Sequence, residues 1–159
     1  MIVADVSILV HCVIDGEKTK EARQLWNLDK EWLVPTFWQV EFQSVLWKYV
    51  RFQGMPANKA IILMEYAIQL FSANERPIFR DSALREAIAS GITVYDAQYV
   101  ALARQLNAPC VTLDKRLQKA CPDRVVLLDA FLSNRSGDGL IREASAGYKV
   151  KKEPFNHRP

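Results

Sequence analysis

The sequence predicts an α/β protein in which a mostly parallel sheet is covered by helices on both faces. Short and almost continuously apolar runs, such as residues 2–4, alternate along the chain with longer segments whose apolar residues recur at helical spacing. Strands of a parallel sheet are buried on both faces, so they read as continuous apolar runs, whereas half-exposed strands alternate. The 159 residues are enough for one domain with a sizeable core.

The expected strands are mostly apolar runs at residues 2–4, 32–34, 110–113 and 125–128. The expected helices have apolar residues three and four positions apart, and they lie at 17–28, 36–52, 59–71, 79–90, 93–106, 115–120 and 129–132. Thr36 with Gln39 fits a capping box at the start of the second helix. Thr93 with Asp96 fits another, and Asp81 is a plausible N-cap for the helix before it.

The chain divides into a neutral body and a basic tail. Small polar residues and glycines dominate residues 133–139, so we expect one domain at 1–132 and a C-terminal extension at 133–159. Residues 140–159 carry five of the 21 basic and two of the 18 acidic side chains, which leaves the remainder neutral. A basic terminus can contact RNA or an acidic partner, although a solvated terminus has the same composition.

The composition argues against several classes of protein. No run approaches the roughly 20 apolar residues of a membrane span, and the first residues do not resemble a signal peptide, so we expect a cytoplasmic location. The cysteines, Cys12, Cys110 and Cys121, are odd in number and far apart, which argues against disulfides and a zinc site. With only His11 and His157 present, histidine acid–base catalysis is poorly supplied.

Four acidic residues lie where strands should end or helices should begin: Asp5, Glu41, Asp96 and Asp114. Each has apolar neighbours that predict burial, and a buried carboxylate needs something cationic to neutralise it. Ligands of parallel sheets bind beyond the carboxyl ends of the strands, so these distant residues can converge at one edge. Because Mg²⁺ and Mn²⁺ prefer oxygen ligands, the set predicts a site for one or two divalent cations.

Such a site suits phosphodiester hydrolysis, which needs an activated water molecule and neutralised phosphate oxygens. Ser7 and Thr112 lie two residues from Asp5 and Asp114, where their hydroxyls could orient a carboxylate or a phosphate, or satisfy nearby backbone groups. Each acid also has a structural alternative. Asp96 and Asp114 could stabilise helix N-termini, and the other two could form buried ion pairs.

These residues resemble the motifs of the PIN-domain nucleases. Asp5-Val6-Ser7 is similar to the D-x-S that follows the first strand of the family, and Glu41 matches its glutamate in the helix after the second strand. Residues 95–103 (YDAQYVALA) resemble its central "DA…A.A" segment, and residues 112–117 (TLDKRL) resemble its "T.D" segment. The order and approximate spacing match over residues 1–132.

The resemblance implies a three-layer α/β/α sandwich whose four acids are catalytic and bind Mg²⁺ or Mn²⁺. It also implies an endoribonuclease that leaves a 5′-phosphate and a 3′-hydroxyl. The single-domain layout is most similar to VapC-type toxins of toxin–antitoxin modules, which commonly form homodimers and are neutralised by a small antitoxin protein. The tail after Ser133 is longer than that of the minimal family.

Two other functions match parts of the pattern. A metal-dependent phosphatase of the haloacid dehalogenase type also has an aspartate after a buried strand, but it requires D-x-D, and Ser7 occupies the second position here. The other alternative is a non-catalytic PIN-like module that binds proteins, against which the complete set of acids argues. The aromatic and apolar helices at 36–52 and 59–71 could form a surface for a second copy or an antitoxin.

Overall fold

The computed structural model describes residues 1–136, and a parallel sheet of five strands lies at their centre. The strands, β1 (Ile2–Ala4), β2 (Trp32–Pro35), β3 (Glu75–Arg76), β4 (Cys110–Thr112) and β5 (Val125–Leu127), have the spatial order β3-β2-β1-β4-β5. The helices are α1 (Val6–Val13), α2 (Thr19–Leu28), α3 (Trp38–Gln53), α4 (Ala57–Phe71), α5 (Ser82–Ser90), α6 (Val94–Gln105), α7 (Lys115–Ala120) and α8 (Leu128–Ser136), with a 3₁₀ turn η1 (Ser72–Asn74).

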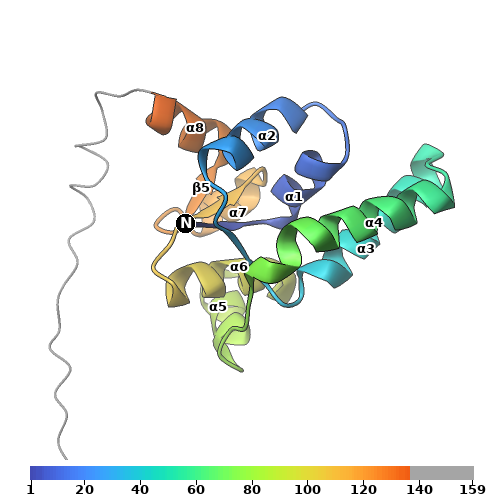
Figure 1. The fold of residues 1–159 in the computed structure, drawn as a ribbon. Helices are drawn as coiled ribbons and strands as arrows, with labels where there is room; N and C mark the ends of the chain where they lie inside the picture. The colour runs from blue at the N-terminus through green and yellow to red at the C-terminus, as the bar shows by residue number, and fades with distance from the viewer. Residues whose placement is uncertain (137–159) are drawn as a thin grey trace, which may run out of the picture.

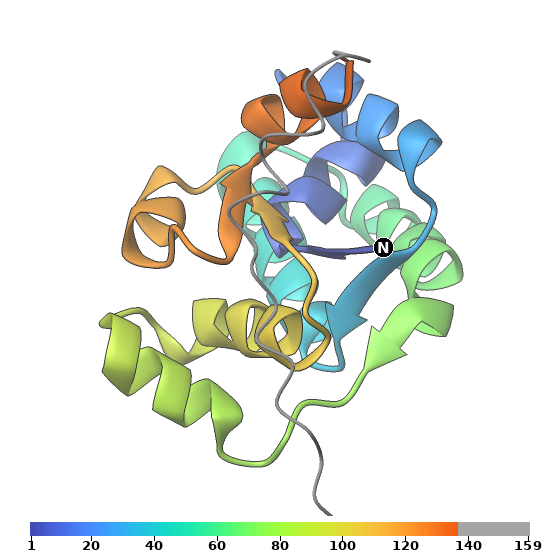
Figure 2. The ribbon, with the colours of Figure 1, turned by 90° about the vertical axis from the view of Figure 1, so that its left-hand side faces the viewer.

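Helices cover both faces of the sheet, which confirms the predicted α/β/α architecture (Figures 1 and 2). On one face α6 packs against β1, β2 and β4, with α5 outside it. On the other face α1 and α8 contact the strands, and α2 packs on both of these helices. The residues of β1 and β4 are completely buried, which explains why these strands have no exposed polar alternation. The α3–α4 hairpin projects to one side (Figure 1).

Two elements were not recognised in the sequence. The segment after Asp5 is the helix α1, whose residues are almost all apolar because five of the eight are buried. The edge strand β3 is only two residues long and is defined by its pairing with Val34 and Pro35 of β2. The first element has an apolar run but no clear amphipathic period, and the second has no apolar run, so neither carries the signal by which its type is found in a sequence.

The helix starts differ in part from those predicted. The capping box of Thr36 and Gln39 is wrong, because α3 begins at Trp38 and the Gln39 amide donates a 2.7 Å hydrogen bond to Glu75 of β3 instead. Asp81 does occupy the N-cap position of α5, but its carboxylate accepts from the Arg85 side chain rather than from the backbone.

The predicted boundary at residue 133 falls inside α8, which continues to Ser136. Most of the predicted basic extension, from residue 137 onward, lies outside the described residues. Among the helices that the structure describes, none is long and apolar enough to cross a bilayer.

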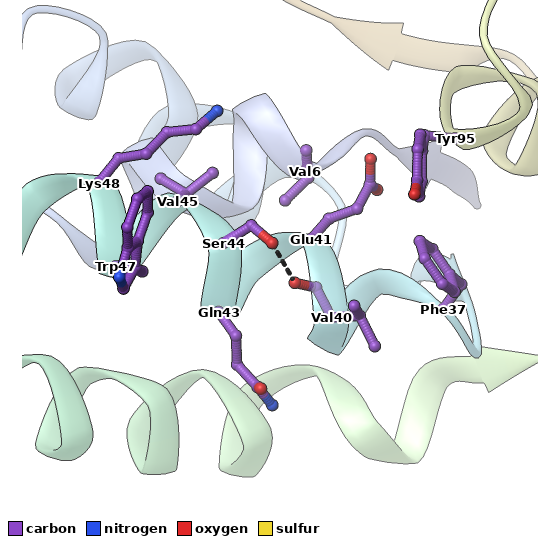
Figure 3. A pocket seen from close by; sticks show the side chains of 10 residues that line it. All are labelled: Val6, Phe37, Val40, Glu41, Gln43, Ser44, Val45, Trp47, Lys48 and Tyr95. Atoms are coloured by element: carbon purple, nitrogen blue, oxygen red, sulfur yellow. Dashed lines mark hydrogen bonds between the residues drawn. The ribbon is translucent and has the colours of Figure 1, made fainter.

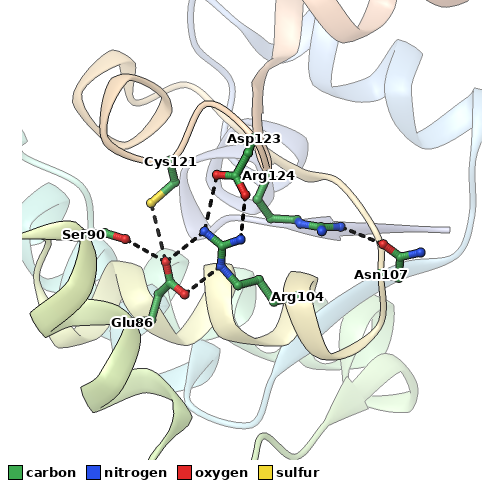
Figure 4. A network of polar contacts seen from close by, with 7 residues as sticks. All are labelled: Glu86, Ser90, Arg104, Asn107, Cys121, Asp123 and Arg124. Carbon is green, nitrogen blue, oxygen red and sulfur yellow. Dashed lines mark hydrogen bonds and ion pairs between the residues drawn. The ribbon is translucent and has the colours of Figure 1, made fainter. Parts of the chain in front are cut away.

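An ion-pair network centred on Arg104 joins α5 and α6 to the loop before β5 (Figure 4). Arg104 Nε lies 2.7 Å from Glu86 Oε2, and Arg104 Nη1 lies 2.6 Å from Asp123 Oδ2. The Ser90 hydroxyl also donates to Glu86, over 2.8 Å. Burial raises the pKa of Glu86, but the hydrogen bonds from Arg104 and Ser90 outweigh it, so the pKa lies below its usual value. We call these residues, together with Cys121, the Arg104 network.

Candidate active site

Three of the predicted acids lie at the carboxyl edge of the sheet, close enough for their charges to influence one another. Asp5 follows β1, Glu41 lies in the first turn of α3, and Asp96 lies in the first turn of α6. The chain crosses from β1 to β2 on one side and reaches β4 on the other, so this edge is the switch point at which open α/β sheets bind ligands. The negative charges of Asp5 and Asp96 both act on Glu41 and raise its pKa. We call these three residues the acidic site.

Asp5 is held by one of its two carboxylate oxygens. Its side chain is buried, and Oδ2 accepts hydrogen bonds from the hydroxyls of Ser7 (2.5 Å) and Thr112 (2.7 Å). The Ser7 backbone N–H donates to the same oxygen, over 3.4 Å. Burial nevertheless raises the pKa of Asp5, so these hydrogen bonds do not fully replace water. Within the described residues, Oδ1 receives no hydrogen bond and is available to a ligand.

Glu41 has the least compensated charge of the site. Burial, with smaller contributions from Asp5 and Asp96, raises its pKa to about 7. Its Oε2 atom is buried and has no hydrogen-bond partner among the described residues. The hydroxyl of Tyr99, which is fully buried on α6, lies close enough to influence this pKa but does not complete a hydrogen bond. Tyr99 was missed in the sequence, although it follows Asp96 by three positions and therefore shares its helix face.

Asp96 and Asp114 both perform the structural roles that the sequence left open. Thr93 and Asp96 form the predicted capping box, in which the Thr93 hydroxyl donates to Asp96 Oδ2 over 2.7 Å. Asp114 is the N-cap of α7, and its Oδ1 accepts from the backbone N–H groups of Arg116 and Leu117. Asp114 is exposed, so its predicted burial is wrong.

Asp114 is nevertheless linked to the acidic site. Its backbone N–H donates to the Thr112 hydroxyl over 3.0 Å, and the same hydroxyl donates to Asp5. Ser7 completes the link, because its hydroxyl accepts from the Leu113 N–H. The hydroxyls of Ser7 and Thr112 therefore join the ends of β1 and β4.

The acidic site suits a hydrated divalent cation. No ion pair reaches its carboxylates from any described residue, and two of its oxygens, Asp5 Oδ1 and Glu41 Oε2, lack hydrogen bonds. The described residues contain no group of three or more acidic, histidine or cysteine side chains arranged to hold a metal ion. Mg²⁺ does not require such a cage, because it keeps several waters and usually binds through one or two carboxylates.

A groove with a volume of about 770 Å³ begins at the acidic site and follows α3 (Figure 3). Its lining includes Phe37, Glu41, Val45, Trp47, Lys48 and Tyr95. Glu41 is thus shared between the groove and the acidic site. The groove gives an extended ligand access to Glu41 from the side of α3.

Two proteins of known structure share this fold. A crystal structure of PAE2754 from Pyrobaculum aerophilum superimposes with a TM-score of 0.67, covering 87% of this chain and 100% of that one at 20% identity. A crystal structure of FitAcB from Neisseria gonorrhoeae superimposes with a TM-score of 0.59, covering 80% of this chain and 96% of that one at 15% identity.

Sequence comparison gives a closer assignment. Ribonuclease VapC3 of Pyrobaculum aerophilum is 27% identical over an alignment of 125 residues that covers 76% of this chain and 95% of that protein. The family model of the PIN domain matches residues 2–122, a segment that contains β1 to β4 and all four predicted acids. The chain therefore belongs to the PIN domain family.

Proposed function

We propose that this protein is an endoribonuclease that depends on Mg²⁺ or Mn²⁺ and uses the acidic site to hold the cation. The observation that carries the proposal is the convergence of Asp5, Glu41 and Asp96, from three separate elements, without a cationic partner among the described residues. Maintaining carboxylates whose pKa values are raised costs folding free energy, and such groups cluster at functional sites. The similarity to a protein named as a ribonuclease supports the choice of substrate.

The acids and the two hydroxyls of the site would have different roles in RNA hydrolysis. A bound divalent ion would supply an activated water and neutralise charge on the phosphate oxygens. Asp5 and Glu41 would face the ion with their free oxygens, and Asp96 would add charge from the start of α6. Ser7 and Thr112 would hold Asp5 in position. Asp114, whose Oδ1 caps α7, would contribute at the rim through its other oxygen.

We also propose that the enzyme is the toxin of a toxin–antitoxin module and works as a homodimer. The relative named VapC3 supports the first part. A second copy of the chain and an antitoxin would each require an apolar docking surface. The α3–α4 hairpin exposes large apolar side chains that could form one: Trp47, Phe52, Ile61, Ile62, Tyr66 and Ile68. Light scattering on the purified chain, alone and with a co-expressed small protein from the same operon, tests both assemblies.

The decisive experiment is cleavage of total cellular RNA by the purified protein with Mg²⁺ or Mn²⁺. Cleavage should disappear with EDTA and in an Asp96→Asn variant, and it should persist in Asp15→Asn, a matched change at an exposed aspartate outside the acidic site. Cleavage that survives EDTA or Asp96→Asn would contradict the proposal. A folded wild-type protein that cuts no RNA with any divalent ion would favour a non-catalytic binding module, and release of phosphate from a monoester would favour a phosphatase.

A further inference from the structure

The groove along α3 combines two aromatic rings and a cation with one of the acids. Phe37 precedes α3, and Tyr95 lies in the first turn of α6 beside Asp96. Their ring centroids are 5.4 Å apart, with 35° between the ring planes. Tyr95 is 56% exposed, so its ring is accessible at the end of the groove next to Glu41. The exposed ring of Tyr95, supported from behind by the half-buried ring of Phe37, is a platform on which a planar group can stack.

Lys48 lies at the other end of the groove. It follows Glu41 by seven residues, which corresponds to two helical turns and about 10 Å along the axis of α3. Figure 3 shows that Glu41 and Lys48 extend to the same side of the helix, whereas Gln43 points to the other side. Among the described residues Lys48 has no ion pair, so its ammonium group is available to an anion.

We infer that the groove binds unpaired nucleotides of the RNA next to the scissile phosphate, with a base stacked on Tyr95 and Phe37 and a backbone phosphate on Lys48. The inference rests on the proposed ribonuclease function and adds how the substrate is selected. A stacked base must be free of its own helix, so the groove selects single-stranded segments and loops. It reaches the acidic site at Glu41, so a strand bound there leads to this member of the site.

Binding of short fluorescein-labelled oligo(U) and oligo(A) RNAs to the full chain, followed by anisotropy in EDTA, tests the groove without cleavage. Tyr95→Leu removes the ring but keeps an apolar side chain, and we expect about tenfold weaker binding. Tyr95→Phe should bind as the wild type does. Phe79→Leu, a comparable loss of an exposed ring between β3 and α5 and outside the groove, should have no effect.

The cation is tested in the same assay. Lys48→Gln should weaken binding about threefold and make its salt dependence shallower, because one phosphate contact is lost. Lys20→Gln, at an exposed lysine of α2, is the matched control and should bind normally. In an oligonucleotide that contains 2-aminopurine, the wild type should quench the fluorescence of the base by stacking, and Tyr95→Leu should not.

Each outcome separates this inference from the proposed function. If the wild type cleaves RNA with Mg²⁺ while Tyr95→Leu and Lys48→Gln bind and cleave normally, the groove does not hold RNA and the inference is wrong. If these variants keep RNA affinity but lose a co-purifying antitoxin, the groove is a protein site and the inference is equally wrong. If the wild type cleaves nothing but the two variants still lose RNA affinity against their controls, the groove stands and only the catalytic proposal fails.

Discussion

The acidic site and the Arg104 network contain the same kind of side chain in opposite electrostatic settings. In the network, the Glu86 side chain is 10% exposed and lies 2.7 Å from a guanidinium, and its pKa is lowered. In the acidic site, burial raises the pKa of Asp5 and Glu41, and the described residues place no cation beside them. Both groups lie next to α6, so the contrast does not come from different regions of the core.

This contrast separates residues that hold the fold together from residues that weaken it. A buried carboxylate paired with arginine retains its charge and fastens two elements together, whereas unpaired buried carboxylates repel one another. The second arrangement is reasonable only when an external cation completes it. The two groups therefore respond in opposite ways to substitution, and the following predictions use that difference.

The largest expected effect is on RNA cleavage. Asp5→Asn, Glu41→Gln and Asp96→Asn should each lower the initial rate at least about a hundredfold, because each removes a charge that attracts the cation. Glu86→Gln should change the rate little when it is measured well below the melting temperature of the variant. Asp114→Asn should lie between these extremes, since Asp114 is exposed and already caps α7. A rate loss in Glu86→Gln as large as that in Glu41→Gln would contradict the separate roles of the acidic site and the Arg104 network.

The second effect is on folding. Arg104→Met should destabilise the protein by about 2 kcal/mol, because Glu86 and Asp123 lose their cationic partner and Glu86 is nearly buried. This destabilisation is smaller than that expected for a fully buried ion pair, because the Arg104 side chain is 38% exposed. The urea midpoint measures the change. Arg23→Met, which breaks the exposed pair with Asp15, should shift the midpoint little, and an equal shift would contradict the central role of Arg104.

The third effect is a difference in pH dependence. Without metal, Glu41 has a pKa of about 7 when folded, compared with 4.5 in its usual state. Between these values the folded protein keeps a proton that the unfolded chain releases. Stability should therefore fall as pH rises, by up to about 1.4 kcal/mol per pH unit, and the loss is complete above pH 7.

Glu41→Gln should remove the part of this slope that comes from Glu41, leaving the part that comes from the raised pKa of Asp5, and it should make the metal-free protein more stable than the wild type above pH 7. Glu86→Gln should make the protein less stable than the wild type at neutral pH, because the lowered pKa of Glu86 stabilises the fold there. The difference from the wild type should shrink as pH falls, since this contribution is lost when Glu86 takes up a proton. Urea unfolding at several pH values in EDTA measures all three proteins. Parallel stability curves for the wild type and Glu41→Gln would mean that Glu41 ionises normally.

The smallest effect concerns the hydroxyls that hold Asp5. Thr112→Val removes the 2.7 Å hydrogen bond to Asp5 Oδ2, and it should lower cleavage about tenfold and stability by about 1 kcal/mol. Thr112→Ser should restore both. Ser133→Ala is the control, because within residues 1–136 this hydroxyl binds only a backbone carbonyl of α8. Unchanged cleavage in Thr112→Val would show that Ser7 positions Asp5 without help.

The sheet and the acidic site could be predicted because their signals are local. Buried parallel strands leave apolar runs, and Asp5 interrupts such a run at the end of β1. The predicted helix around Glu41 and the capping box of Asp96 also rest on short sequence patterns. In contrast, α1 is buried so completely that its sequence has little helical period, and β3 exists only through its pairing with β2.

The features that could not be predicted depend on contacts between residues that are distant in the sequence or on the direction in which a side chain points. Arg104 and Glu86 are 18 residues apart, and nothing in either segment marks them as partners. The opposite error occurred at Asp114, where apolar neighbours in the sequence predicted burial but the side chain turns outward to cap α7. The Tyr95–Phe37 ring pair likewise joins two helix starts that are distant in the chain.

Manganese binding tests the central claim most directly, because it does not depend on finding the right RNA. The electron paramagnetic resonance signal of free Mn²⁺ can be followed above pH 7 as the ion is added to the wild type, Asp5→Asn, Glu41→Gln and Glu86→Gln. The wild type and Glu86→Gln should remove Mn²⁺ from solution, and Asp5→Asn and Glu41→Gln should not. Equal uptake by all four proteins, or no uptake by the wild type, would contradict a cation site built from the unpaired acids.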